Sequence, residues 1–430
     1  MKNRFKILAI LSIMMLMSPA VWATNGDNLI GVGPISRAMG GVGIAAPQDA
    51  IGAVFANPAA MCFGPYCPSS EFNFAGTLFM PEVEASVSGP AVGGGKISGD
   101  SRSNVYTIPA IGISAPLTEN APFWRFGLAA YGVSGLGVDY RSTPLDNPSF
   151  AGFGGAPLIS GEYTQLQIMK FAPAIALQPS NQWSFGLGMQ IDYATLDLRN
   201  GASPGYAFGA QLGTIYRPTN AISLGLTYVS PQKVTHNNVI STTDPVGNPI
   251  NAELALESPQ QLGFGAAYEW SGFLLEANAK WLNWSDADGY KDFEWDDQWV
   301  FAVGGQYYAT EKLVLRAGYN FGKNPVKENN GWDGAIPGGV PNDAVNVQGT
   351  IFPRYYYETF RIIGFPAIVE HHITLGAGYD YSPRFSLHLG FVYAPAETIT
   401  ETGTGPNGLP VTIESELSET SFDFGLTWRF

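Results

Sequence analysis

Hydrophobic and polar residues alternate with a period of two along most of this chain from Glu71 onward. In the last ten residues, one extended face carries Phe422, Phe424, Leu426, Trp428 and Phe430, and the other carries Asp423, Gly425, Thr427 and Arg429. Successive side chains of a strand point to opposite faces, so this alternation predicts strands with one apolar and one polar face. A chain that ends on such a strand, with an aromatic last residue, is typical of a closed barrel with lipid outside and water inside.

The same alternation recurs in about 14 segments, separated by stretches rich in Gly, Pro, Asn and Asp. We expect strands that start near Glu71, Ser103, Trp124, Glu162, Gln182, Gly205, Ile222, Ser258, Phe273, Gln298, Leu313, Glu370, Arg384 and Ser415. Short turns alternate with long polar connections, which predicts an extracellular end with its longest loops at residues 140–161, 231–257 and 323–369. The predicted fold is all-β, a transmembrane antiparallel β-barrel over residues 67–430.

Composition indicates the cellular location of the protein and argues against other classes of protein. Residues 1–23 combine three basic residues, an apolar core too short to span a bilayer and a Val21-Trp22-Ala23 cleavage site, which predicts a secretory signal peptide. No later run of about 18 apolar residues exists, which argues against a helical membrane protein. The net charge of -14 argues against a nucleic-acid partner, because phosphate binding needs a surplus of cations. We therefore expect the outer membrane of a Gram-negative bacterium.

Residues 24–66 show neither strand alternation nor a sustained helical stripe, and they are rich in Gly and Ala. The many inward-facing glycines of the predicted strands leave volume in the lumen. We interpret this compact, nearly uncharged segment as a plug that fills that volume; the alternative is a mobile periplasmic arm. Cys62 and Cys67 lie close enough in sequence to form a disulfide in an oxidising periplasm, with two free thiols as the alternative.

Within this segment, Ser36-Arg37-Ala38-Met39-Gly40, Asp49-Ala50 and Asn57-Pro58-Ala59 follow one another between a Gly-rich run and the first strand. In that arrangement the chain resembles the N-terminal hatch of the FadL family of outer-membrane transporters, and the similarity extends over the whole mature chain. The resemblance implies a 14-stranded barrel, a lumen blocked by the hatch, and hydrophobic cargo. It places Arg37, Asn57, Pro58 and Ala59 in the hatch, the last three in its rearranging part; an ordinary Asn-Pro turn is the alternative.

The resemblance also implies sideways release of cargo through a gap at a kinked third strand. The third predicted strand is irregular: Trp124, Phe126 and Leu128 set an outward phase that resumes at Leu136, with small residues between. Glycines permit a bulge there, and prolines in both flanking strands cannot donate to the ladder. The candidate gap residues are Pro109, Ala130, Gly132, Ser134, Gly135, Gly137 and Pro173. The alternative is that both prolines occupy tolerated bulges.

Other candidate ligand residues lie in the lumen and in one outer loop. Alternation places Lys280 and Arg316 inside, where a cation could hold a fatty-acid carboxylate; pairing with other luminal charges is the alternative. His372 and His388, on neighbouring strands, could meet, but without a third ligand we predict no metal site. The last long loop is unusually apolar, which predicts capture of cargo or a lid over the barrel mouth. Its candidates are Phe352, Tyr355, Tyr356, Phe360 and Phe365.

We therefore expect passive outer-membrane uptake of hydrophobic molecules, either long-chain fatty acids or aromatic and aliphatic hydrocarbons, without a cofactor. The expected surroundings are outer-membrane lipid, lipopolysaccharide and the barrel-assembly machinery, and the expected state is a monomer. No Gly-x-Ser-x-Gly or His-Glu-x-x-His motif occurs, so we do not predict an enzyme. The alternatives are a polar-solute porin, a barrel enzyme that acts on lipids, and an adhesion or structural barrel.

Overall fold

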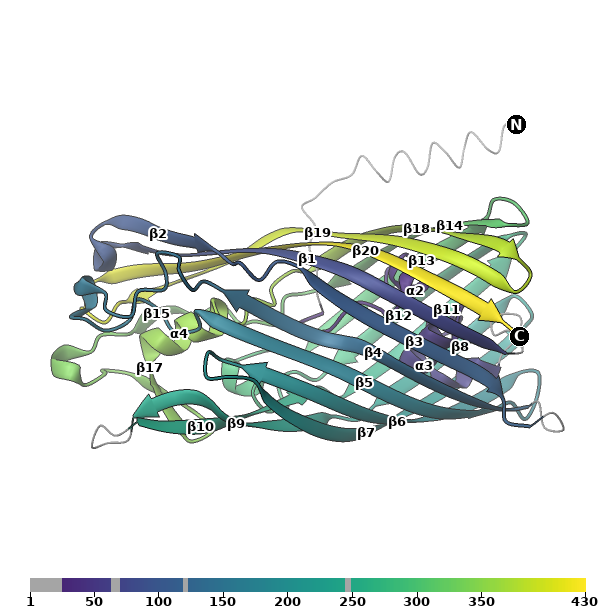
Figure 1. The fold of residues 1–430 in the computed structure, drawn as a ribbon, viewed down its shortest axis with the longest axis horizontal. Coiled ribbons are helices and arrows are strands. Elements are labelled where there is room, and N and C mark those ends of the chain that lie inside the picture. Colours follow the sequence, from purple (N-terminus) through teal and green to yellow (C-terminus); the bar gives the residue numbers. More distant parts are fainter. Residues whose placement is uncertain (1–24, 63–69, 119–122, 244–248) are drawn as a thin grey trace.

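The computed structural model describes residues 25–62, 70–118, 123–243 and 249–430. Within these residues, 14 strands form a closed antiparallel barrel (Figure 1). They are β1 (Glu71–Gly89), β3 (Tyr106–Pro116), β4 (Trp124–Asp139), β5 (Tyr163–Leu177), β6 (Trp183–Asp197), β7 (Ser203–Thr219), β8 (Ile222–Val229), β11 (Gln261–Trp270), β12 (Phe273–Leu282), β13 (Gln298–Tyr308), β14 (Leu313–Gly322), β18 (His371–Ser382), β19 (Phe385–Thr404) and β20 (Pro410–Arg429). The barrel closes where β1 pairs with β20, from Glu71 opposite Arg429 to Ser88 opposite Thr412. The predicted fold is confirmed.

The two ends of the barrel differ, as the loop lengths predict. Tight turns lie at the end that carries the C-terminus, and the long connections lie at the other end, which we call the outer end (Figure 1). These connections contain η2 (Pro90–Val92), β2 (Gly95–Asp100), η3 (Ala151–Phe153), β9 (Gln232–Thr243), β10 (Pro249–Ser258), η4 (Lys291–Phe293), β15 (Asn330–Asp333), η5 (Pro337–Gly339), β16 (Ala344–Val347), β17 (Thr350–Pro353) and α4 (Arg354–Ile362). The loops expected at residues 231–257 and 323–369 are therefore partly a β-hairpin and a helix.

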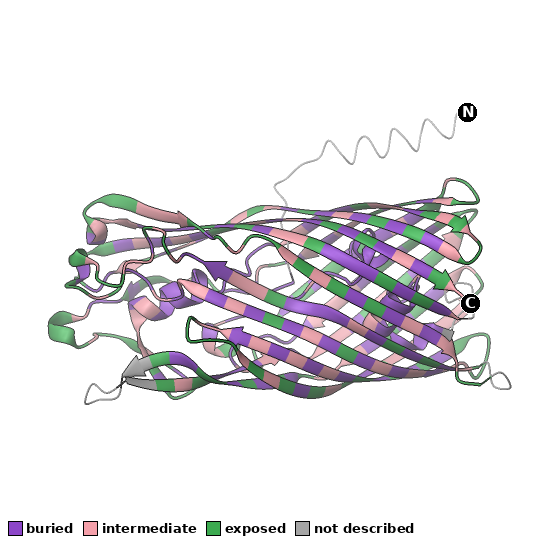
Figure 2. Cartoon of the chain, in the orientation of Figure 1, coloured by how far each residue is buried: buried purple, intermediate pink, exposed green. Residues whose placement is uncertain are grey.

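Exposure alternates along most of the barrel strands, as the bands in Figure 2 show. On β6, Leu187 and Met189 are 51% and 47% exposed, whereas Gln190 and Asp192 on the opposite face are 2% and 1% exposed. Exposed apolar side chains of this kind form the lipid-facing surface, and the polar side chains line the lumen. Among the described residues, no helix has the length and hydropathy needed to cross a membrane.

Residues 25–62 lie inside the barrel, where they form α2 (Pro34–Arg37), α3 (Ala50–Ala56) and η1 (Pro58–Cys62) (Figure 1). Asp49 caps α3 because its side chain accepts a hydrogen bond from the Gly52 amide at 2.7 Å. Nearly all of this segment is buried. The expected signal peptide, residues 1–23, lies outside the described residues, as does Cys67 of the expected disulfide with Cys62.

Candidate transport path

Inward-facing glycines let the backbone of residues 25–62 lie directly against the barrel wall. A Cβ at Gly213 would lie 2.0 Å from Asn57 Oδ1, and one at Gly304 would lie 2.0 Å from the Met39 carbonyl oxygen. The same close approach, below 3.0 Å, occurs at Gly112, Gly127, Gly186, Gly225, Gly265, Gly318, Gly376 and Gly425. Any larger residue would force the inner segment away from the wall. These glycines therefore provide the space in which residues 25–62 contact the barrel strands.

The Asn57-Pro58-Ala59 triplet is anchored to three wall strands. The Asn57 amide donates to the Ile44 carbonyl at 2.8 Å and to the Thr214 carbonyl of β7 at 3.1 Å, with a longer bond to β8. Its Oδ1 accepts from the Ala59 amide at 3.1 Å, and the Ala59 carbonyl accepts from the Ser184 hydroxyl of β6. The triplet therefore fixes the end of the inner segment to the wall, which an exposed turn would not do.

Arg37 joins the inner segment to the strands that close the barrel. Its Nε donates to Asp423 Oδ1 at 2.8 Å and a terminal nitrogen donates to the Ser421 hydroxyl at 2.6 Å, both on β20. Asp423 also accepts from Thr77 of β1. The side chains of this ion pair are only 3% and 0% exposed, so removal of one partner would leave a buried charge without compensation.

The wall is interrupted between β3 and β4. Their pairing ends at Ala110 opposite Tyr131, and the following stretch of β4 pairs with β5 and has no partner in β3. Contact resumes at the outer end, where the Arg102 amide donates to the Asp139 carbonyl at 2.9 Å. Between these two points the side chains of β3 narrow the space: a Cβ at Gly132 would lie 2.5 Å from Ile108, and one at Gly137 would lie 2.2 Å from the Tyr106 hydroxyl.

A bulge in β4 accompanies this interruption. The pairing of β4 with β5 shifts between Gly132 and Ser134, so Val133 is the extra residue. One extra residue exchanges the two faces of a strand, and Val138 is accordingly buried. The expected return of the outward phase at Leu136 is therefore wrong: Leu136 pairs with the inward-facing Leu166. Ala130, before the bulge, keeps its pairing partners in both neighbouring strands.

The two prolines of the proposed gap lie in different ladders. Pro109 directly precedes Ala110, the last residue of β3 that pairs with β4, so it lies at the edge of the interruption. Pro173 pairs with Leu128 of β4, and the ladder that is broken beside it, between Phe171 and Ala174, is the one with β6. Pro173 therefore does not border the interruption, which differs from the expected arrangement.

The start of the inner segment occupies the free edge of β4. The Leu29 amide donates to the Val133 carbonyl at 3.0 Å, and the Gly135 amide donates to the Asp27 carbonyl at 3.3 Å. The Asp27 carboxyl accepts from the Tyr290 hydroxyl, and Trp284 packs so closely on Gly26 that a Cβ there would lie 2.7 Å from the ring. Burial raises the pKa of Asp27 to about 6. Residues 26–29 are thus held on one side by the outer connection that carries Trp284 and Tyr290, and on the other by the free edge of β4.

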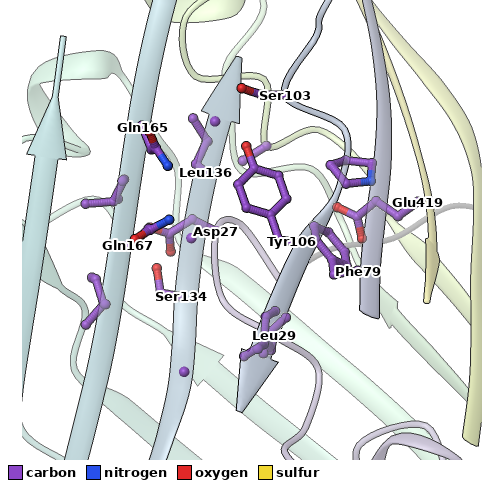
Figure 3. Close-up of a pocket in the computed structure, with 18 of the residues that line it drawn as sticks. Asp27, Leu29, Phe79, Ser103, Tyr106, Ser134, Leu136, Gln165, Gln167 and Glu419 are labelled. Atoms are coloured by element: carbon purple, nitrogen blue, oxygen red, sulfur yellow. The ribbon is translucent and has the colours of Figure 1, made fainter. Parts of the chain in front are cut away.

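A cavity of about 680 Å³ opens at this interruption (Figure 3). Its lining includes both faces of β5, with Leu166 and Ile168 buried and Gln167 exposed, so it passes through the wall. It reaches from buried Asp27 and Glu419 to Val105, which is 60% exposed. Of the candidate gap residues, the lining contains Pro109, Gly132, Ser134, Gly135 and Gly137, and it does not contain Ala130 or Pro173. Its volume lies in the range of about 300–1,000 Å³ that is usual for small-molecule sites.

Sequence reasoning missed the acidic end of this cavity. Asp27 precedes any recognisable element, and Glu419 is one of two inward acidic positions on β20, so only their common position at one cavity distinguishes them. The alternation along β20 does place Glu419 inside. Nothing in the sequence brings it next to Phe79 and Leu29, because those contacts depend on the path of the inner segment.

The predicted luminal cations do not line the cavity. Arg316 is buried, and its Nε donates to Gln306 Oε1 at 3.1 Å. Lys280 and Ile44 of the inner segment both lie beside Gly263 of β11. His372 and His388 do not meet: His388 lies opposite Gly378 of β18, far along the strand from His372, and bonds to Thr427 at 3.1 Å. Among the described residues, no group of three potential ligands could hold a metal ion.

The apolar outer loop is mostly buried, which agrees with the alternative of a lid rather than with an exposed capture surface. Tyr355, Phe360 and Phe365 are 0%, 5% and 0% exposed, because α4 packs into the outer mouth of the barrel. Phe360 packs on Phe365 with ring centroids 5.3 Å apart, and the Tyr356 hydroxyl bonds to the Pro157 carbonyl at 2.9 Å. Phe352 and Phe360 nevertheless line a second cavity of about 270 Å³ at the outer end.

Comparisons with known proteins place these features in context. A family model described as Outer membrane protein transport protein (OMPP1/FadL/TodX) matches residues 25–205 and 199–339. The toluene transporter TodX of P. putida is 18% identical, with a TM-score of 0.64 over 93% of this chain and 99% of that chain. A Pseudomonas aeruginosa FadL homologue is 13% identical (TM-score 0.66; 94% and 99%), and the Ralstonia pickettii toluene transporter TbuX is 15% identical (0.62; 94% and 99%). No curated protein sequence matches the chain. Such low identities establish a likeness of fold alone.

Proposed function

The chain belongs to the OMPP1/FadL/TodX family of outer-membrane transport proteins, and from this premise we propose that it is a passive uptake channel for hydrophobic molecules. It is an outer-membrane protein of a Gram-negative bacterium. The two similar structures named as toluene transporters support aromatic hydrocarbons as cargo, with aliphatic hydrocarbons and long-chain fatty acids as the wider class. The role is non-enzymatic and uses no cofactor, because partitioning down a gradient drives the movement.

One observation carries this proposal: a largely apolar cavity passes through the wall beside the length of β4 that has no partner in β3. A cargo molecule that reaches it from the outer end can leave sideways into the bilayer without crossing the segment below. In this scheme residues 25–62 act as a hatch, and displacement of residues 25–29 from the free edge of β4 widens the exit. The second cavity, beside Phe352 and Phe360, is the proposed entry point.

A substitution that fills the exit tests the proposal. A Cβ at Gly135 meets only the Leu166 carbonyl at 3.4 Å, so Gly135→Leu fits the fold while its side chain fills the cavity mouth. We expect uptake of labelled toluene by cells that express this variant to fall to background. Heat-modifiable migration on gels checks that the barrel has assembled.

Gly305→Leu is the matched control. Gly305 lies on β13, away from the interruption, and a Cβ there meets the Leu274 carbonyl at 3.3 Å. This variant should assemble and retain uptake. Normal uptake by assembled Gly135→Leu protein would contradict lateral exit, and absence of toluene uptake by the unmodified protein would contradict aromatic hydrocarbon transport.

A further inference from the structure

The charges around the wall cavity limit what it can hold. Two acidic side chains, Asp27 and Glu419, line its buried end. Arg102 is the only basic residue among the described lining residues; it lies at the open end, 55% exposed, and pairs with Asp139 at 3.0 Å. Arg37, which lines a small pocket together with Glu419, already pairs with Asp423 and Ser421. A carboxylate drawn into this cavity would lose its water next to acidic groups and gain no free cation.

The same end offers hydrogen-bond acceptors to a neutral ligand. Glu419 is 7% exposed, and its one ion-pair partner among the described residues is His372, whose Nε2 lies 3.5 Å from Oε2. Figure 3 shows its carboxyl group beside Phe79 and Tyr106, directed toward the cavity. Carboxyl oxygens accept a hydroxyl or amine proton well, because such bonds strengthen in a site with little water. Leu29, Phe79, Ile168 and Leu417 form apolar walls around this polar end.

From this distribution we propose that the cavity selects an uncharged apolar molecule with one hydrogen-bond donor, such as a phenol or an alcohol, over the carboxylate of the same skeleton. The inference rests on the proposed transport function and narrows its cargo class, since it places fatty-acid anions outside the preferred ligands. The apolar walls hold the skeleton, and Glu419 accepts from the donor. Neither Lys280 nor Arg316 contributes, because neither reaches the cavity.

Binding of three matched aromatic ligands to the purified full chain in detergent tests this inference. The probes are 4-methylphenol, toluene and 4-methylbenzoate at pH 8, with dissociation constants measured by titration calorimetry. We expect 4-methylphenol to bind at least as tightly as toluene, and 4-methylbenzoate to bind about tenfold more weakly than either. Equal or tighter binding of 4-methylbenzoate would overturn the charge argument. Weaker binding of 4-methylphenol than of toluene would overturn the donor argument.

Glu419→Gln assigns the selectivity to this residue. It removes the charge and keeps an acceptor, so the ratio of 4-methylbenzoate to toluene dissociation constants should fall severalfold. Glu414→Gln, on the same strand but paired with exposed Lys96 outside the cavity, should leave the ratio unchanged. An unchanged ratio in Glu419→Gln would refute the role of Glu419. If that variant does not assemble, competition in the unmodified protein decides, because 4-methylbenzoate should fail to displace bound 4-methylphenol.

These measurements distinguish failure of the proposed transport function from failure of the proposed cargo preference. If none of the three ligands binds and labelled toluene is not taken up, the proposed transport function fails. If toluene is taken up and the ligands bind without the expected order, transport stands and the cargo inference alone fails.

Discussion

Two seams of this barrel, β1 with β20 and β3 with β4, show how the same kind of sequence can seal a wall or open it. The first runs from Glu71 opposite Arg429 to Ser88 opposite Thr412 without a shift in register. The second ends at Ala110 opposite Tyr131, next to a proline on one strand and a bulge on the other. The inner segment contacts both seams, with a buried ion pair at the first and a few backbone hydrogen bonds at the second. Side-chain alternation occurs at both seams. The difference lies in the backbone hydrogen bonds, which are continuous at the first seam and end beside the proline and the bulge at the second.

The largest effect should come from a proline in the closed seam. Phe424 pairs with Gly76 on one side and with Leu389 on the other, so Phe424→Pro removes a ladder hydrogen bond where the strand has no free edge. We expect a loss of more than about 3 kcal/mol and failure of assembly, measured by heat-modifiable migration. Gly137→Pro, on the length of β4 that has no β3 partner, requires only that the Tyr106 side chain move aside, so this variant should assemble in good yield. Equal loss at both sites would mean that the second seam is paired in solution.

A smaller effect should follow from Arg37→Ala at the first seam. The substitution leaves Asp423 buried without its cation, which costs about 3 kcal/mol. Because the contact joins the inner segment to the wall, the loss should appear as faster protease cleavage within residues 25–62 and as leakage of small antibiotics. Lys96→Ala removes an exposed pair with Glu414 and should cost less than about 1 kcal/mol. Identical protease sensitivity of the two variants would contradict the anchoring role.

The smallest effect should be a pH dependence at the second seam. The pKa of Asp27 is raised by burial from 3.8 to about 6, so the folded contact favours the protonated carboxyl. Its contribution is complete below pH 3.8 and is lost as the pH rises through about 6, with a total of less than about 3 kcal/mol. Hydrogen exchange of residues 25–29 should therefore be slower at pH 5 than at pH 8 after correction for intrinsic rates. Asp27→Asn should remove this difference, and its persistence in that variant would assign it elsewhere.

Sequence reasoning succeeded where one local rule repeats along the chain. Each of the expected strand starts lies within a few residues of an observed barrel strand, because a lipid-facing side and a wet side impose strict alternation. The family match confirms the resemblance that was based on the stretch from Ser36 to Ala59. The same reasoning failed at Leu136: the glycines indicated a bulge, but the prediction did not include the reversal of faces that one extra residue causes beyond it.

The outer connections and the cavity could not be predicted in this way. The aromatic residues of α4 suggested a surface site, but a helix in the barrel mouth buries Tyr355 and Phe365 instead. Lys280 and Arg316 were placed in the lumen correctly by alternation, yet the cavity lies elsewhere around the wall. Asp27 and Glu419 come together only because the start of the chain crosses the lumen to the free edge of β4. Contacts of such long sequence separation depend on topology, which periodicity does not encode.

The ion pair between Arg37 and Asp423 has a consequence for the order in which the molecule is made. Its partners are separated by 386 positions, so one lies in the inner segment and the other on β20, the last barrel strand in the sequence. The inner segment therefore cannot complete its contacts with the wall until β20 has joined the barrel. A barrel that lacks β20 cannot form this ion pair with the inner segment. The pairing of β20 with its neighbours is therefore also the step that fixes the inner segment inside the barrel.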